Sequence, residues 1–329
     1  MRRAVLACLP VLAAAAVAGG CGSSSSDSAT VPTTAPPASQ PQDFPKPAGK
    51  TVSQLVAGLP QGPQLAPAVA VLPARQADRF GFGLFDRAGK QIGGAQVALY
   101  TAARDGSDVR GPYPVRSESL AVKPQFVSQT SAQDAGAAKS VYVGRAPFPS
   151  AGKRVVFALA RLDGRLVATP PTEIQVGVGG PPQVGQKAPK ITTPTAASVG
   201  GDLAKIDTRV PPDTMHDVNY ADAYGKKPII LVFATPQLCQ SRVCGPIVDI
   251  AEQTKAANAG KAAFIHMEIY NGNDASKGFR PQVQAFGLPT EPWIFGINRK
   301  GVVAARLEGA ASAREVQQLV DTTVASGRT

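Results

Sequence analysis

The sequence predicts two folded regions of different class, an all-β region over residues 59–180 and an α/β region over residues 184–329. Three observations lead to this prediction. Short apolar runs with a period of two residues recur up to residue 180, without a helical period of convincing length. A Pro181-Pro182 pair then marks a boundary, and strand-like runs alternate with amphipathic helical segments after it, which is the order of an α/β fold.

The amino-terminal segment predicts export. Arg2 and Arg3 precede an apolar run over residues 4–17 that is too short for a good membrane span, and small residues then lead to Cys21. This pattern resembles the lipobox of bacterial lipoproteins, which implies a signal peptide over residues 1–20 and lipidation of Cys21. We therefore expect a protein anchored by lipid on Cys21 at the extracytoplasmic face of the cell membrane.

Residues 21–58 are rich in Ser, Thr and Pro and nearly free of large apolar side chains. Such a composition cannot bury enough apolar surface to fold by itself. The sequence thus predicts a disordered tether between the membrane and the first folded region.

The all-β region contains three runs in which alternate residues are apolar. These runs hold Phe80, Phe82 and Leu84; Val155, Phe157 and Leu159; and Ile174, Val176 and Val178. Turn signals such as Asp163-Gly164 lie between the runs, and short strands at this spacing predict a β-sandwich. The region resembles the immunoglobulin-like domains of bacterial envelope proteins, which implies either a spacer that packs on its neighbour or a domain that binds a ligand.

The α/β region contains a regular succession of expected elements. Strands are expected at 228–233, 262–270, 293–297 and 302–307, and helices at 246–258, 279–286 and 312–324. The last two strands flank a turn and predict a hairpin. This order predicts a mixed sheet with helices on both faces.

Four motifs in this region resemble the thioredoxin fold of extracytoplasmic thioredoxin-like proteins and redoxins. They are VGQKAPK at 184–190, GKKPIILVFATP at 225–236, CGP at 244–246 and EPWIFGINRKG at 291–301. The resemblance implies that Pro292 is a cis-proline, and that Pro292 and Trp293 shape a substrate groove beside the cysteine site. It implies no cofactor.

Cys239 and Cys244 are the candidate catalytic residues. Once Cys8 leaves with the signal peptide and Cys21 is lipidated, these two are left to pair with each other in a compartment where disulfides persist. Because a helix N-terminus stabilises a thiolate, Cys244 is expected to attack and Cys239 to resolve, with Arg242 as support for the thiolate. The expected function is thiol–disulfide exchange, with the thiols or disulfides of envelope proteins as partners.

The site also departs from the thioredoxin pattern. Thioredoxin places its two cysteines two residues apart, whereas Ile247 stands at the position of the second cysteine here. Glu291 before Pro292 is the other departure, because a carboxylate close to a thiol raises the thiol pKa. These departures leave open a non-catalytic envelope module that binds a partner and in which the disulfide is a permanent brace.

Two further functions remain as alternatives. Pro236 and Ser241 before Cys244, together with Arg280, suggest a peroxiredoxin-like peroxidase, although Pro236 lies one residue too far upstream. A copper(I) chaperone would use both cysteines and a histidine. The chain has only His216 and His266, and His266 alternates with apolar residues, as structural side chains on strands do.

Two other side chains have structural alternatives. Trp293 is expected to pack in the core or at a domain interface if it does not line the groove. Asp249 is expected to be a solvated carboxylate favoured by the helix dipole, rather than a buried proton acceptor like the aspartate of thioredoxin, whose position it does not match.

The formal net charge of +11 bears on the partners. An exported chain without aromatic residues interleaved in its basic stretches is not expected to bind nucleic acid. A basic surface that faces anionic lipid or cell-wall polymer is the expected interpretation.

Overall fold

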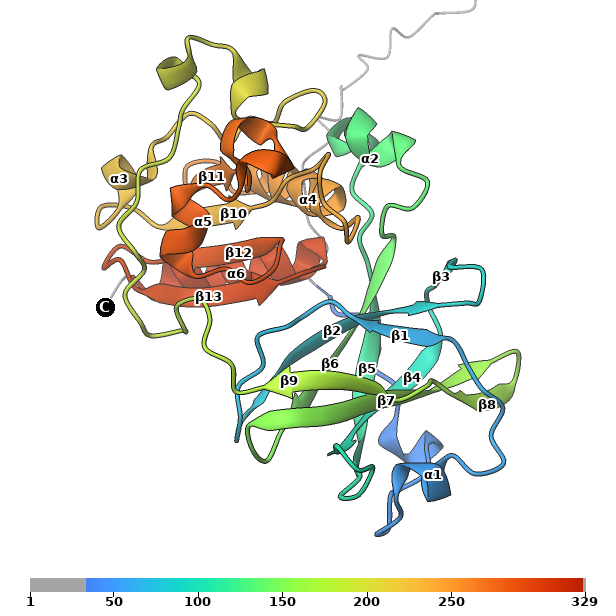
Figure 1. Cartoon of the computed structure of the whole chain (residues 1–329). Helices are drawn as coiled ribbons and strands as arrows, with labels where there is room; N and C mark the ends of the chain where they lie inside the picture. The colour runs from blue at the N-terminus through green and yellow to red at the C-terminus, as the bar shows by residue number, and fades with distance from the viewer. Residues whose placement is uncertain (1–33, 328–329) are drawn as a thin grey trace, which may run out of the picture.

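The structure is a computed structural model that describes residues 34–327. The expected signal peptide, the lipidation site Cys21 and the first part of the tether lie outside the described residues. Two regions follow each other along the chain, an all-β domain and a mixed α/β domain (Figure 1). Among the described residues, none of the helices has both the length and the apolar character to cross a bilayer.

The all-β domain is built from nine strands whose pairings with one another are all antiparallel. They are β1 (Gln64–Pro67), β2 (Ala77–Phe85), β3 (Gln91–Ile92), β4 (Gln96–Ala103), β5 (Arg110–Ser119), β6 (Ser140–Pro147), β7 (Gly152–Leu162), β8 (Arg165–Ala168) and β9 (Thr172–Val176). The order is β1-β2-β6-β5-β4-β7-β8, with β3 added to β2 and β9 to β7. Side chains of β2 and β7, far apart in this order, share one core, so the sheet closes over itself as a sandwich.

The apolar residues of the first two runs are buried as predicted, but β7 is buried on both of its faces and shows no alternation in burial. Phe80, Phe82 and Leu84 of β2 are fully buried, as are Phe157 and Leu159 of β7. The prediction for the third run is wrong at its end. β9 stops at residue 176, and Val178 lies beyond it with 51% of its surface exposed.

The part of the expected tether that the structure describes, residues 34–58, is not disordered. It contains η1 (Pro41–Asp43) and α1 (Val52–Leu55), the latter closed by a capping box on Thr51. Phe44, Val52 and Leu55 are buried on the outer face of β4 and β7. Three well-spaced apolar side chains therefore dock a segment whose overall composition predicts disorder.

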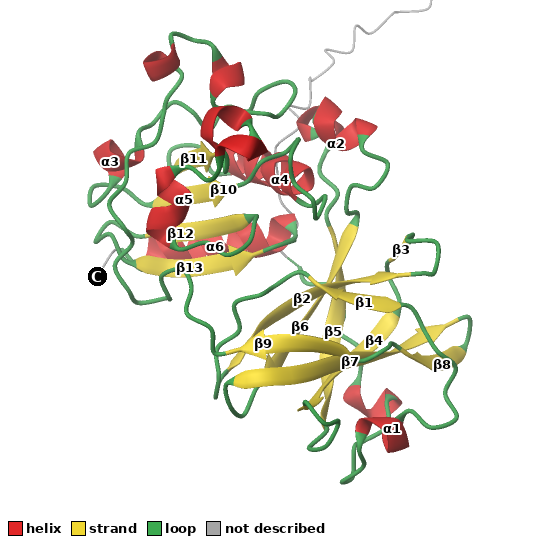
Figure 2. Cartoon of the chain, viewed as in Figure 1, coloured by secondary structure: helices red, strands yellow, loops and turns green. Residues whose placement is uncertain are grey.

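The α/β domain has one four-stranded sheet in the order β11-β10-β12-β13 (Figure 2). Its strands are β10 (Ile229–Phe233), β11 (Ala263–Met267), β12 (Trp293–Ile297) and β13 (Val303–Glu308), and its helices are α3 (Tyr220–Ala223), α4 (Cys244–Ala257), α5 (Pro281–Phe286) and α6 (Ala313–Ala325). Pairing is parallel between β10 and β11 and antiparallel elsewhere. Helices α4 and α6 share one core with the sheet, while α3 and α5 share the core on its other face.

The expected elements of this domain match these bounds to within a few residues. The sequence features that predicted these elements are local. At α6, for example, Ser312 and Glu315 form a capping box before the amphipathic segment. Short 3-10 turns fill the long connections: η3 (Ala197–Val199), η4 (Leu203–Lys205), η5 (Asn271–Asn273) and η6 (Ala275–Lys277).

The two domains are joined by a continuous core and by buried ion pairs. Leu120, Val141 and Val143 of the β domain belong to the same apolar cluster as α4 and α6. Arg79 donates to Glu315 at 2.7 Å, and Arg314 donates to Glu118 across the same interface. The β domain is therefore packed firmly on the α/β domain.

Candidate functional site

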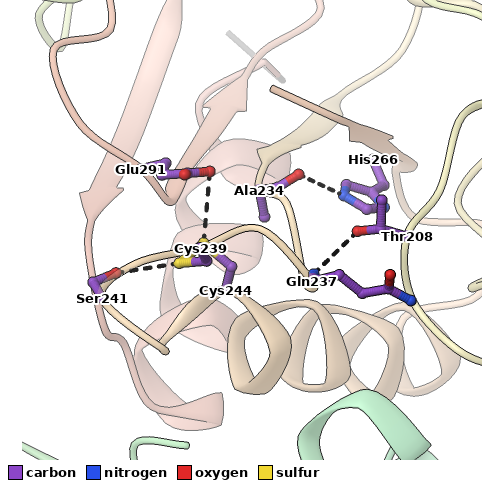
Figure 3. Close-up of a disulfide and its surroundings, with 8 residues drawn as sticks. All are labelled: Thr208, Ala234, Gln237, Cys239, Ser241, Cys244, His266 and Glu291. Atoms are coloured by element: carbon purple, nitrogen blue, oxygen red, sulfur yellow. Dashed lines mark hydrogen bonds between the residues drawn. A yellow bond between two sulfur atoms is a disulfide. The ribbon is translucent and has the colours of Figure 1, made fainter. Parts of the chain in front are cut away.

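A disulfide joins Cys239 to Cys244 at the N-terminus of α4, with 6.0 Å between the two Cα atoms. Cys244 is the first residue of the helix, and Cys239 lies in the loop that leads to it from β10 (Figure 3). The buried strand β10 delivers the chain to this point, and Pro246 suits the first turn of α4, where an amide N–H has no helical partner. Strand and helix thus fix the position of both sulfurs.

The two sulfurs differ in accessibility. Cys244 has no exposed surface and belongs to the core that α4 and α6 form. Cys239 is only partly buried, and its Sγ lies 3.2 Å from the Oγ of the exposed Ser241. An incoming thiol therefore meets Cys239 first.

Glu291 lies against the buried sulfur. Its Oε2 is 3.8 Å from the Sγ of Cys244, and Figure 3 shows the carboxyl group pointing at the disulfide. Burial, with a smaller contribution from the neighbouring charge of Glu268, raises the pKa of Glu291 to about 8. The group therefore carries a proton at neutral pH and can donate it to a departing thiolate.

The Glu291–Pro292 peptide bond is cis, as predicted. The position expected for Trp293 beside the disulfide is not confirmed. Trp293 is 1% exposed, stacks on Phe295 at 5.5 Å and donates from its indole nitrogen to Thr290. It is a core residue, as its alternative interpretation held, and Pro292 is also buried.

The side chain of Arg242 pairs with the β domain rather than with the cysteines. Its guanidinium donates to Asp134 of the β domain at 2.6 Å, and its carbonyl accepts from the Ala138 amide at 3.1 Å. Its backbone φ is +56°, a left-handed conformation that is uncommon for a residue other than glycine. The contacts with the β domain hold the loop in this conformation.

The prediction that Asp249 is solvated is wrong. Asp249 is 2% exposed, pairs with the guanidinium of Arg209 at 2.8 Å and accepts from the amide and hydroxyl of Ser128. Ser128 precedes α2 (Gln129–Gln133), which the β domain places beside α4 (Figure 1). A carboxylate so fully bonded is a structural anchor between the domains.

Two histidines and two aspartates form a separate buried group, here called the His–Asp cluster: Asp207, Asp213, His216 and His266. His266 has Nδ1 2.7 Å from Asp213 and Nε2 3.1 Å from the carbonyl of Ala234. Although burial lowers the pKa of His266, the carboxylates of Asp213 and Asp207 raise it to about 10. Burial raises the pKa of Asp213, but the charge of His266 outweighs it and brings the value to about 2.

The contacts of Arg280 and Ser241 do not support a peroxidase site around Cys244, and the positions of the histidines do not support a copper site with the cysteines. Arg280 is held by the Tyr270 carbonyl and by Asn273, and Ser241 contacts Cys239 rather than Cys244. Among the described residues, the histidines group with the aspartates, whereas the cysteines group with Glu291. In the oxidised protein the disulfide occupies both sulfurs of that second group, so it offers no thiolate to a metal.

Comparisons with known proteins give little further information. No family model matches the chain, and no curated protein matches it. Among solved structures, the crystal structure of the Lin-41 filamin domain is similar at 14% sequence identity, covering 37% of this chain and 100% of its own length with a TM-score of 0.20. A TM-score this low supports no inference about fold or function.

In the His–Asp cluster, Asp207 and Asp213 were not identified as site residues from the sequence, and His216 was considered only as a possible copper ligand. Asp207, Asp213 and His216 lie within ten residues of one another in the sequence IDTRVPPDTMHDV. This concentration of metal-ligating and titratable types before β10 was a usable signal. Its fourth member, His266, lies on β11, fifty residues further along the chain.

Proposed function

We propose that this protein is a lipid-anchored, extracytoplasmic thioredoxin-like protein that exchanges disulfides with envelope proteins through Cys239 and Cys244. One observation carries the proposal. The disulfide sits at a helix N-terminus, with one sulfur in a partly exposed loop and the other buried against a carboxyl group that holds a proton. That combination supplies an accessible point of attack, a stabilised leaving group and a proton donor.

The topology of the α/β domain supports the thioredoxin-like assignment. Parallel strands β10 and β11 are connected through α4, α5 follows, and the antiparallel pair β12 and β13 leads to α6. A cis peptide bond stands before β12, and the cysteines stand before and at the start of α4. In this assignment the β domain is an immunoglobulin-like spacer that packs on its neighbour.

Because Cys239 is accessible and Cys244 is buried, the expected roles of the two cysteines are reversed. Cys244 was expected to attack, but a fully buried sulfur is not reached by a partner while the disulfide is closed. We therefore assign Cys239 as the sulfur that forms the mixed disulfide and Cys244 as the buried resolving thiol.

The exchange proceeds in two successive thiol–disulfide exchange steps. A partner thiolate attacks Sγ of Cys239, the Cys239–Cys244 bond breaks with its electron pair on Cys244, and the carboxyl group of Glu291 transfers its proton to that sulfur. A second partner thiolate then attacks the partner's sulfur in the mixed disulfide and releases Cys239 as a thiolate. The partner leaves oxidised to a disulfide and the protein is left as a dithiol, and the reverse sequence reduces a partner disulfide.

The membrane anchor remains a proposal from the sequence. Lipid on Cys21, after removal of residues 1–20, would hold the domains at the extracytoplasmic face of the membrane. There the basic chain faces anionic lipid, and envelope proteins with thiols or disulfides are within reach.

The reduction potential of the disulfide tests the function. The full-length protein is equilibrated with glutathione and dithiothreitol buffers, trapped by alkylation and read by mass. A potential between about −120 and −270 mV, the range of exchange proteins, is expected. A potential below about −300 mV identifies a permanent brace and would replace exchange by a non-catalytic binding module.

Single-cysteine variants test the assigned roles. In Cys244→Ser the remaining Cys239 is expected to react with iodoacetamide at least about tenfold faster than Cys244 does in Cys239→Ser, because only Cys239 is accessible. Alkylation rates under native conditions, with a denatured sample as the reference for intrinsic reactivity, give the comparison. Equal rates, or a faster Cys244, would restore the original order of attack.

A further inference from the structure

The His–Asp cluster lies behind the disulfide loop and belongs to a different part of the chain. Asp207, Asp213 and His216 come from the loop before α3, which runs along the edge strand β11, and His266 projects from that strand. All four residues are at most 3% exposed. Their ligand atoms lie within 4.8 Å of one another.

We propose that this cluster binds one divalent transition-metal ion, Zn²⁺ in the first instance, through Nε2 of His216, Nδ1 of His266 and one carboxylate oxygen each from Asp207 and Asp213. Imidazole nitrogen and carboxylate oxygen are ligands that Zn²⁺ takes in tetrahedral sites. Four protein ligands and no solvent access make it a structural site rather than a catalytic one.

The separations between ligand atoms fit this coordination. Nε2 of His216 lies 3.2 Å from Oδ2 of Asp207 and 3.4 Å from Oδ1 of Asp213. Nδ1 of His266 lies 3.8 Å from Oδ1 of Asp207 and 2.7 Å from Oδ2 of Asp213, so each carboxylate presents a different oxygen to each imidazole. Ligands about 2.0–2.1 Å from the metal in a tetrahedron are about 3.3–3.4 Å apart. Completing the site therefore requires each carboxylate to turn one oxygen toward both imidazoles, with the metal replacing the hydrogen bond between His266 and Asp213.

The charges of the cluster also favour a divalent ion. Two buried carboxylates, those of Asp207 and Asp213, lie beside the two imidazoles of the cluster. The guanidinium of the nearby Arg209 is already paired with Asp249. A divalent cation placed among these ligands offsets buried negative charge, which lowers the cost of keeping the carboxylates out of water.

Three of the four ligands are already oriented by outer contacts, as metal ligands usually are. Only His216, whose Nδ1 has no partner among the described residues, lacks such a contact. The orienting bonds are His266 Nε2 to the Ala234 carbonyl, the Arg209 and Asp213 amides to Asp207, and the Met215 amide to Asp213.

The position of the cluster gives the metal a role beneath the disulfide. The loop that carries Cys239 starts at Ala234, which accepts from His266, and the amide of Gln237 donates to the hydroxyl of Thr208 at 3.2 Å (Figure 3). Thr208 directly follows the ligand Asp207 in sequence. A bound ion would therefore restrain the segment that supports the disulfide loop.

Metal loading of the full-length protein tests the proposal. The chain is unfolded with chelator but without reductant, so that the disulfide stays closed, and is refolded with Zn²⁺ or Co²⁺. One equivalent of zinc per chain is expected by elemental analysis, together with a higher Tm than the metal-free protein has. Co²⁺ is expected to show the visible bands of tetrahedral nitrogen and oxygen coordination, without a sulfur charge-transfer band.

Two variants separate this site from unspecific binding. His216→Gln should weaken zinc binding by about 100-fold or more, because it removes a direct ligand. Asp217→Asn changes the adjacent, exposed carboxylate and should keep one equivalent. If His216→Gln fails to fold, the cobalt spectrum of the unmodified chain still decides.

Three results would overturn the metal site: no bound zinc after refolding, a cobalt spectrum with sulfur ligation, or full binding by folded His216→Gln. Each of them identifies a purely hydrogen-bonded cluster or a site at the cysteines. None depends on disulfide exchange, so the two proposals fail independently.

Discussion

Glu291 is the residue whose charge state most directly couples the disulfide to pH. Its pKa is raised from about 4.5 to about 8, so the folded protein keeps a proton that the unfolded chain releases. The stability from this group is fully present below about pH 4.5 and is lost as the pH rises to about 8. Glu291→Gln should therefore flatten the fall in the free energy of unfolding between pH 5 and 8, by at most about 1.4 kcal/mol per pH unit.

Urea unfolding at pH 5 and pH 8 measures this effect. Glu173→Gln is the matched control, since the pKa of Glu173 is lowered by Lys153 and Arg104 and the group titrates below that range. The Glu291 prediction is wrong if both variants keep the slope of the unmodified chain.

At this scale the sequence predicted the residues that stand in recognisable motifs and missed those that do not. Cys239, Cys244 and Glu291 were recognisable because they stand in short motifs at strand and helix ends. The contact of His266 with Asp213 depends on a loop that runs along β11, and no periodic pattern encodes that placement.

Among the elements, the segment between β5 and β6, residues 120–139, has the clearest bearing on the site. It includes η2 (Pro124–Phe126) and α2 and reaches from the β domain to the start of α4. Asp134 in this segment holds Arg242, whose left-handed backbone lies between the two cysteines in sequence. Removing the ion pair should let the disulfide loop open more often.

Asp134→Asn is therefore expected to speed reduction of the disulfide by dithiothreitol about two- to fivefold, as an exposed pair contributes about 0.2–1 kcal/mol. Asp108→Asn, which removes a partly exposed ion pair with Arg110 elsewhere in the β domain, should leave the rate unchanged. Thiol release followed by mass after alkylation gives both rates. An unchanged rate in Asp134→Asn would show that this segment does not restrain the loop.

Elements with strong local periodicity were predictable, while docked segments were not. The strands and helices of the α/β domain follow from apolar alternation and caps, as at Ser312. Residues 34–58 were misjudged because composition averages over the segment, whereas docking depends on the few side chains that find a groove, such as Phe44.

For the whole molecule, the interface makes the two domains a single structural unit. The apolar cluster that contains Val143 and Val316 spans both of them. Burial raises the pKa of Glu315, but Arg79 outweighs it and lowers the value, which means that the charged pair is favoured across the interface. Neither the cluster nor the pair was visible in sequence, because each domain's pattern specifies its own core and not the face it shares.

We therefore expect both domains to unfold in one transition, which a buried interfacial substitution shifts as a whole. Glu118→Ala leaves the buried Arg314 without its carboxylate and should lower the free energy of unfolding by about 3–5 kcal/mol. The single tryptophan, Trp293, reports the α/β domain by fluorescence, while far-UV circular dichroism reports both domains. The two signals should give the same urea midpoint in each protein.

Glu173→Ala is the control, because Glu173 pairs with Arg104 and Lys153 on the exposed surface of the β domain, and its midpoint should match that of the unmodified chain. Separate transitions by the two signals would contradict a single unit. A Glu118→Ala midpoint as high as that of the control would show that the ion pair only accompanies an interface held by its apolar core. In that case the coupling between the sandwich and the disulfide loop would rest on residues 120–139 alone. The Asp134→Asn variant would then decide whether the sandwich restrains the loop at all.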